Sequence, residues 1–125
     1  MSVGADELEL ARSFLAALEA AARTGDRAPL AAFLCDDVEW AMPQRTLHGV
    51  DEVLHEPIWW RPREHVELEV VEGEWGRRED GGLSSRLRQV YRLKATGEIA
   101  YERIRTVELA FRGGCISRYE LRDAG

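Results

Sequence analysis

Three long segments in the second half of the chain alternate apolar with polar or charged residues, and short glycine turns separate them. The segments cover residues 64–75, 83–93 and 98–111, and a fourth segment, 116–123, follows. Alternation with a period of two indicates strands with one buried face. The turns are too short for a crossover, so consecutive strands are expected to pair antiparallel. The turns predicted to join these strands into one sheet are Asp80-Gly81-Gly82, Thr96-Gly97 and Gly113-Gly114.

The first half of the chain is predicted to be mostly helical. Between residues 6 and 23, apolar residues recur at intervals of three and four, which indicates an amphipathic helix. Gly25 suits the left-handed position that ends a helix, and Asp26 suits the N-cap of the next one. We therefore expect a second, short helix over 27–35.

A short strand is expected over 38–42, followed by a turn or an edge segment over 43–47 and a third helix over 49–58. Pro57 should break or kink the last turn of that helix. Helices followed by one curved antiparallel sheet give an α+β fold, in which the sheet packs on about three N-terminal helices and forms a cone. A length of 125 residues predicts a single domain, with its core over about 6–123.

The composition limits the partners and the cell compartment. The net charge is −6, whereas a nucleic-acid-binding protein needs a basic face that neutralises phosphates. We see no secretory leader, and no apolar run approaches the ~20 residues that cross a membrane. Cys35 and Cys115 lack metal-ligand spacing, so two reduced thiols in a cytoplasmic protein are expected. The only lysine is Lys94, against 16 arginines, a bias that suggests a GC-rich bacterial genome.

Several short motifs occur in an order that resembles a known superfamily. They are Thr24-Gly25-Asp26 between the first helices, Asp36-Asp37-Val38 with Pro43, Leu47-His48-Gly49 before the third helix, and the closing hairpin Phe111-Arg112-Gly113-Gly114-Cys115-Ile116. Together they resemble the nuclear transport factor 2-like (NTF2-like) superfamily, in particular its SnoaL-like and ketosteroid-isomerase-like members. The resemblance covers nearly the whole chain, and it implies an internal pocket between the helices and the sheet. Its members include enzymes and non-catalytic binders, so the fold alone gives no function.

The resemblance also indicates where such relatives carry catalytic groups. A ketosteroid isomerase needs a base, a tyrosine and a protonated aspartic acid. The corresponding positions here are Met42, Leu18 and the neighbourhood of Val107, which argues against a standard ketosteroid isomerase. Epoxide-hydrolase-like relatives place an arginine between two acids; Arg105 matches the arginine, but Val107 stands where one acid is expected. SnoaL-like cyclases use a late aspartate and a histidine, for which Asp123 and His48 are the candidates.

Arg103 and Arg105 share a predicted strand face with apolar residues, and charges on such a face must pair or meet water. They are candidate anchors for an anion or a carbonyl group. The alternatives are a structural salt bridge, or a bulge that turns both side chains toward solvent. The candidate catalytic residues are Asp123, Arg105 and His48, and the candidate ligand-binding residues are Leu18, Trp40, Met42, Trp59, Gln89, Tyr91, Arg103 and Val107. No metal or other cofactor is expected, because the histidines lack ligand-like spacing.

The aromatic candidates favour a flat apolar ligand. The leading prediction is a protein that binds a small, mostly apolar molecule, of an aromatic or polyketide-like kind. If it is an enzyme, the expected chemistry is proton transfer, cyclisation or hydration. The alternative is a non-catalytic ligand-sensing or dimerisation module. On the outer face of the sheet, Arg86, Arg88 and Arg92 are expected to form cross-strand ion pairs with acids, and this face is the predicted homodimer interface.

Overall fold

The computed structural model describes residues 5–55 and 64–123, and it confirms the predicted α+β class. The N-terminal half contains α1 (Ala5–Thr24), a short 3-10 helix η1 (Ala28–Phe33), β1 (Leu34–Ala41), β2 (Thr46–His48) and α2 (Val50–His55). The C-terminal half consists of β3 (Val66–Arg77), β4 (Leu83–Leu93), β5 (Ile99–Arg112) and β6 (Cys115–Asp123). The predicted last turn of the third helix, with Pro57, lies outside the described residues.

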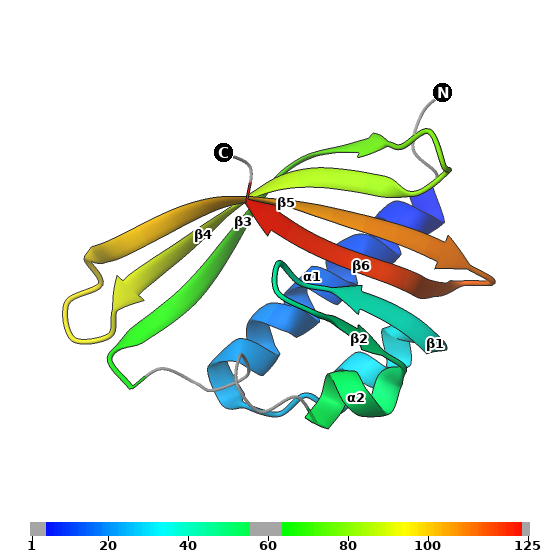
Figure 1. The fold of residues 1–125 in the computed structure, drawn as a ribbon. Helices are drawn as coiled ribbons and strands as arrows, with labels where there is room; N and C mark the ends of the chain where they lie inside the picture. Colours follow the sequence, from blue (N-terminus) through cyan, green and yellow to red (C-terminus); the bar gives the residue numbers. More distant parts are fainter. Residues whose placement is uncertain (1–4, 56–63, 124–125) are drawn as a thin grey trace.

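The strands form one curved, mixed sheet in the order β2-β1-β6-β5-β4-β3. Neighbours from β3 to β6 pair antiparallel, as their short turns predict. By contrast, β1 and β6 are parallel, with Leu34 opposite Ile116 and Trp40 opposite Tyr119. Figure 1 shows α1 crossing beneath the sheet, so that the helix covers its concave side. No helix in the described part of the chain is long and apolar enough to span a membrane.

The joint between α1 and η1 follows the sequence closely. Gly25 has a φ of +80°, the left-handed value that glycine adopts without a steric penalty. The Asp26 carboxylate accepts a hydrogen bond of 3.2 Å from the Ala28 N–H, two residues further on. The N-cap of η1 is Arg27, whose side chain makes no capping hydrogen bond, so the prediction of Asp26 as the N-cap is wrong by one residue. The predicted second helix is shorter than expected, however, because η1 ends at Phe33 and β1 begins at Leu34. Pairing of Leu34 with Ile116 of β6 brings this residue into the sheet and overrides its local preference for helix.

A bulge in β3 coincides with Gly73. The β3–β4 register shifts between Glu72 and Trp75. A Cβ atom at position 73 would lie 2.5 Å from the Arg86 carbonyl oxygen, which real side chains do not tolerate. Glycine therefore allows the two strands to approach at the bulge, where a strand bends and its twist increases.

The core lies where α1 meets β1 and β6. Phe14, on α1, is fully buried, and its ring packs edge-on at 5.9 Å from Trp40 and 5.7 Å from Tyr119. Trp40 is also fully buried and stacks on Tyr119 with 4.0 Å between ring centroids. These contacts join the helix to the first and last strands, so one aromatic cluster fixes the relative position of three elements.

The two cysteines form a disulfide, so the prediction of two reduced thiols is wrong. Cys35 at the start of β1 and Cys115 at the start of β6 have Cα atoms 5.1 Å apart. Their separation of 80 positions in the sequence gave no sign of this contact, which follows from the parallel β1–β6 pairing. At the same corner, Arg112 donates a hydrogen bond to Asp37, and this bond lowers the pKa of the Asp37 carboxyl.

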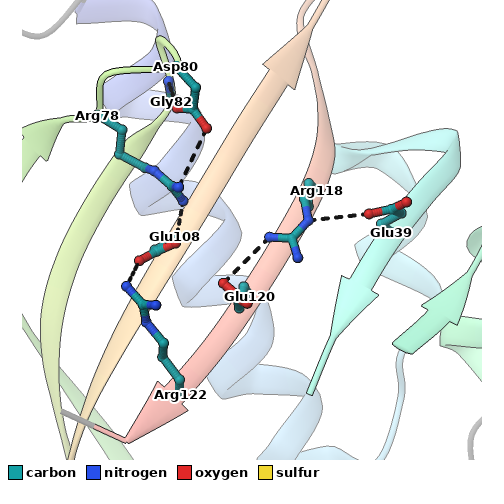
Figure 2. Close-up of polar contacts among 8 residues, drawn as sticks. All are labelled: Glu39, Arg78, Asp80, Gly82, Glu108, Arg118, Glu120 and Arg122. Atoms are coloured by element: carbon teal, nitrogen blue, oxygen red, sulfur yellow. Dashed lines mark hydrogen bonds and ion pairs between the residues drawn. The ribbon is translucent and has the colours of Figure 1, made fainter. Parts of the chain in front are cut away.

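The outer face of the sheet carries a network of ion pairs (Figure 2). The Glu108 carboxylate is almost fully buried and accepts hydrogen bonds from Arg78 and Arg122. The predicted cross-strand pairs include Arg88–Glu102 at 3.2 Å and Arg92–Glu69 at 3.7 Å, which the structure confirms. Arg118 lies 3.2 Å from Glu39 and 3.5 Å from Glu120, so the network continues onto β1 and β6. This network marks the face opposite the helices as polar.

Candidate ligand-binding cavity

A cavity of about 400 Å³ lies between α1 and the concave face of the sheet. The helix contributes one wall, through Leu15, Leu18, Glu19 and Ala22. Residues 42–45, which follow β1, contribute a second wall. The inner faces of β3, β4, β5 and β6 form the remaining wall. The cavity therefore occupies the place where the sequence resemblance implies an internal pocket.

One part of the wall is aromatic and apolar. Trp40 and Tyr119 contribute their stacked rings, Leu121 follows Tyr119 by two residues on β6, and Leu87 lies on β4. Burial raises the pKa of the Tyr119 phenol well above its usual value, although the positive charge of Arg105 opposes this shift. The phenol therefore stays protonated at neutral pH and can donate a hydrogen bond.

A second part of the wall is polar and comes from β4 and β5. Gln89 and Arg103 are opposite each other in the β4–β5 register, and Leu87 is opposite Arg105. Tyr91 stacks on Tyr101 with 4.4 Å between centroids. Both arginines line the cavity, so the predicted strand alternation is confirmed and the alternative in which a bulge turns them to the outer face is wrong.

Arg105 is the buried charge of the site. Its side chain is 12% exposed, and its Nε lies 3.3 Å from Oδ1 of Asp123, the residue opposite it on β6. The contact is an ion pair by distance, but the Nε–H is not aligned for a hydrogen bond with any described residue. Asp123 is 75% exposed at the end of its strand. The guanidinium is therefore only weakly held by its acid and can serve a ligand.

The structure brings most of the predicted site residues together. Those that line the cavity are Leu18, Trp40, Met42, Gln89, Tyr91, Arg103 and Arg105. Asp123 contacts the site through Arg105. Their functional roles remain predictions, but their common location follows the inner-face alternation of the strands.

Two predicted residues are not among the described residues that line this cavity. Val107 is fully buried in the core. On β5 it lies two residues further along the strand than Arg105, opposite Ser85 of β4 and Leu121 of β6. His48 is exposed on β2, and its backbone N–H donates to Glu52 at 2.9 Å, a contact that fixes the start of α2. Trp59 lies outside the described residues. Neither Val107 nor His48 lines this cavity among the described residues, and their functional roles stay predictions.

The sequence analysis missed Glu19, Arg45 and Tyr119. Glu19 follows Leu15 by one helical turn, so helical periodicity could have placed it on the cavity side. Tyr119 alternates with Leu121 and Asp123 on the inner face of β6, the same signal that selected Asp123. Arg45 lies between β1 and β2, where no periodicity applies. No group of His, Cys, Asp and Glu in the described ranges is arranged to hold a metal ion.

Comparisons with solved structures show the same fold in other proteins. An NTF2-like protein of unknown function from Burkholderia pseudomallei aligns with a TM-score of 0.67 and 20% identity, covering 98% of this chain and 92% of its own. A proposed SnoaL-like polyketide cyclase from Mesorhizobium loti aligns with a TM-score of 0.59 and 21% identity, covering 97% and 98%. A protein with a ketosteroid-isomerase-like fold from Catenulispora acidiphila, in complex with trimethylamine, aligns with a TM-score of 0.61 and 14% identity, covering 86% and 82%.

No protein-family model and no curated protein matches the sequence. The similarity is therefore one of structure, at identities too low to transfer an activity. The order of elements, the curved sheet and these alignments agree on one conclusion. This chain has the NTF2-like fold shared by ketosteroid-isomerase-like and SnoaL-like proteins.

Proposed function

We propose that this protein binds a small, mostly apolar, flat molecule in the cavity between α1 and the sheet. One observation carries the proposal: the Arg105 guanidinium is buried in a largely apolar wall with a poorly aligned acid beside it. A buried charged group that lacks hydrogen-bond partners costs folding free energy unless another group accepts its hydrogen bonds. A ligand oxygen would do so.

The shape and lining of the cavity support an aromatic or polyketide-like ligand. A volume of about 400 Å³ is within the usual range for small-molecule sites. Trp40, Tyr91 and Tyr119 offer ring faces or edges to a flat ligand. The likeness to the proposed SnoaL-like polyketide cyclase from Mesorhizobium loti is consistent with this class of ligand.

Any catalysis would differ from that of a standard ketosteroid isomerase. Met42 and Leu18 line the cavity at two positions where the resemblance puts a base and a phenol, and neither transfers a proton. The polar groups in or beside the cavity include Arg105, the protonated Tyr119 phenol and the exposed carboxylate of Asp123. Proton transfer, cyclisation or hydration would then use Asp123 as the acid–base group, while Arg105 and Tyr119 stabilise a ligand oxygen.

The binding proposal predicts that filling the cavity blocks a flat neutral probe. Ala22 lines the cavity from α1, so Ala22→Trp places an indole ring in the space a ligand needs. We expect naphthamide to bind the wild-type protein in isothermal titration calorimetry, and Ala22→Trp to weaken binding by more than about tenfold. Ser13→Trp adds the same ring at an exposed position of α1 and is expected to bind like wild type. Equal affinities for both variants would place the probe elsewhere.

A non-catalytic dimerisation module is the second candidate, and the outer face favours it. Val71 and Ile104 are each 40% exposed there, and both lie opposite Arg88 in the sheet register. This row of apolar and charged groups, flanked by cross-strand ion pairs, suits a homodimer formed through the sheet.

The dimer proposal predicts that Ile104→Lys produces monomers. The substitution puts a second positive charge next to Arg88, where a partner sheet would exclude water. Sedimentation velocity should show a dimer for wild type and for Ala31→Lys, a charge added on the exposed side of η1. A wild-type protein that sediments as a monomer at micromolar concentration would refute this interface.

The remaining partner predictions belong to the same proposal. The acidic chain is expected to bind neither nucleic acid nor membranes. A cytoplasmic location is still proposed from the sequence, although the disulfide removes the argument from reduced thiols.

A further inference from the structure

The described residues of the cavity wall carry more positive than negative charge, although the whole chain has a net charge of −6. Among the described residues of its lining, the charged ones are Arg45, Arg103, Arg105 and a single acid, Glu19. An excess of guanidinium groups in a small cavity selects ligands by charge as well as by shape.

The two acids near the cavity are already engaged. Glu19 accepts a hydrogen bond of 3.2 Å from the Val70 N–H, and its other oxygen lies 3.7 Å from Arg23 on the next turn of α1. The exposed carboxylate of Asp123 lies 3.3 Å (Oδ1) from Nε of Arg105 and offsets its charge. Neither acid is therefore available to compensate a further positive charge in the cavity.

Arg103 is that further charge. It lies two residues before Arg105 on the same face of β5, opposite Gln89 on β4, and it lines the cavity. Within residues 5–55 and 64–123, no acidic side chain lies at ion-pair distance from Arg103. With Arg105 offset by Asp123, the polar part of the wall keeps one uncompensated positive charge on β5.

We propose that the natural ligand is a monoanion, a flat apolar body with one carboxylate that lies between Arg103 and Arg105. This inference rests on the proposed binding function and specifies its ligand class. Guanidinium groups hold carboxylates through paired, charge-assisted hydrogen bonds, and Gln89 supplies a neutral donor beside Arg103. One uncompensated charge suits a carboxylate better than a doubly charged phosphate. The apolar body would then lie against Trp40 and Leu18.

Three probes of nearly equal shape test the charge of the ligand. We expect naphthoate to bind the full-length protein at least about tenfold more tightly than naphthamide of the same substitution pattern. Naphthylmethylammonium should bind more weakly than either, because its charge repels the arginines. The affinities are measured by isothermal titration calorimetry at low and at high salt, and only the naphthoate affinity should fall with salt.

Variants of the arginines locate the carboxylate. Arg103→Gln should lower the naphthoate affinity about tenfold and leave the naphthamide affinity unchanged. Arg105→Gln should also weaken naphthoate, but it removes the buried charge that a ligand oxygen completes, so it should weaken naphthamide as well. The exposed Arg103 provides the variant that removes no buried charge. Arg86→Gln is the matched control, since Arg86 is exposed on β4 and is not part of the cavity wall.

The outcomes separate the ligand class from the binding function. If naphthamide binds as tightly as naphthoate, or the ammonium probe binds best, the monoanion proposal is wrong while the cavity remains a binding site. If Arg86→Gln weakens naphthoate binding as much as Arg103→Gln does, the preference for an anion reflects the overall charge of the protein. The proposed position of the carboxylate between Arg103 and Arg105 is then wrong. If none of the three probes binds at millimolar concentration, the binding function itself fails.

Discussion

Trp40→Ala is expected to lower the free energy of unfolding by about 3–5 kcal/mol, the usual range for removing a fully buried tryptophan. Trp40 is fully buried, and its ring contacts Phe14 and Tyr119 at centroid distances of 5.9 and 4.0 Å. Its removal leaves a cavity between α1, β1 and β6, and the rigid sheet cannot close it. Because the indole also lines the ligand cavity, the variant should lose probe binding as well.

Urea denaturation of the wild-type protein and of Trp40→Ala measures the loss in the free energy of unfolding. Trp75→Ala is the matched control, because Trp75 is only partly buried at the periphery of the core and its Nε1–H donates to Glu72 at 3.0 Å. We expect it to cost less than half as much as Trp40→Ala. Equal losses would mean that the cluster of Phe14, Trp40 and Tyr119 is not the centre of the core.

Reduction of the disulfide should destabilise the protein by about 4 kcal/mol, the loop-entropy value for a crosslink between distant residues. Cys35 and Cys115 are separated by 80 positions, so the bond restricts the unfolded chain strongly. The double variant Cys35→Ala/Cys115→Ala should show the same loss without reductant. Denaturation of the wild type and of the double variant, with and without dithiothreitol, measures both losses of stability.

The double variant is also the control for the reductant, since dithiothreitol should not change its stability further. Thiol titration of the purified wild-type protein gives an independent check, and no reactive thiols are expected. Two free thiols per chain, together with a midpoint that does not respond to dithiothreitol, would contradict the disulfide.

The architecture could be predicted well because its signals are local. Alternation placed β4 over the same residues that the structure gives, and it placed Arg105 and Asp123 on the inner face, where they are partners across β5 and β6. Gly25 marked the end of α1 through backbone geometry alone. Signals of this kind need no knowledge of distant contacts.

The errors arose where long-range pairing decides the outcome. The disulfide depends on the parallel alignment of β1 with β6, which no local pattern reveals. Val107 shares a strand face with Arg105, but alternation does not show where along the strand a cavity ends and a core begins. His48 was selected for its chemistry, whereas its position serves the start of α2.

The parallel pairing of β1 with β6 also has a consequence for synthesis of the chain. Apart from the short β2, the sheet partner of β1 is β6, which leaves the ribosome after every other strand. Phe14 and Trp40 therefore cannot reach their final environment until residues 115–123 have emerged. During translation the nascent protein therefore exposes the apolar face of α1 and the unpaired edge of β1, the kind of surface that chaperones recognise.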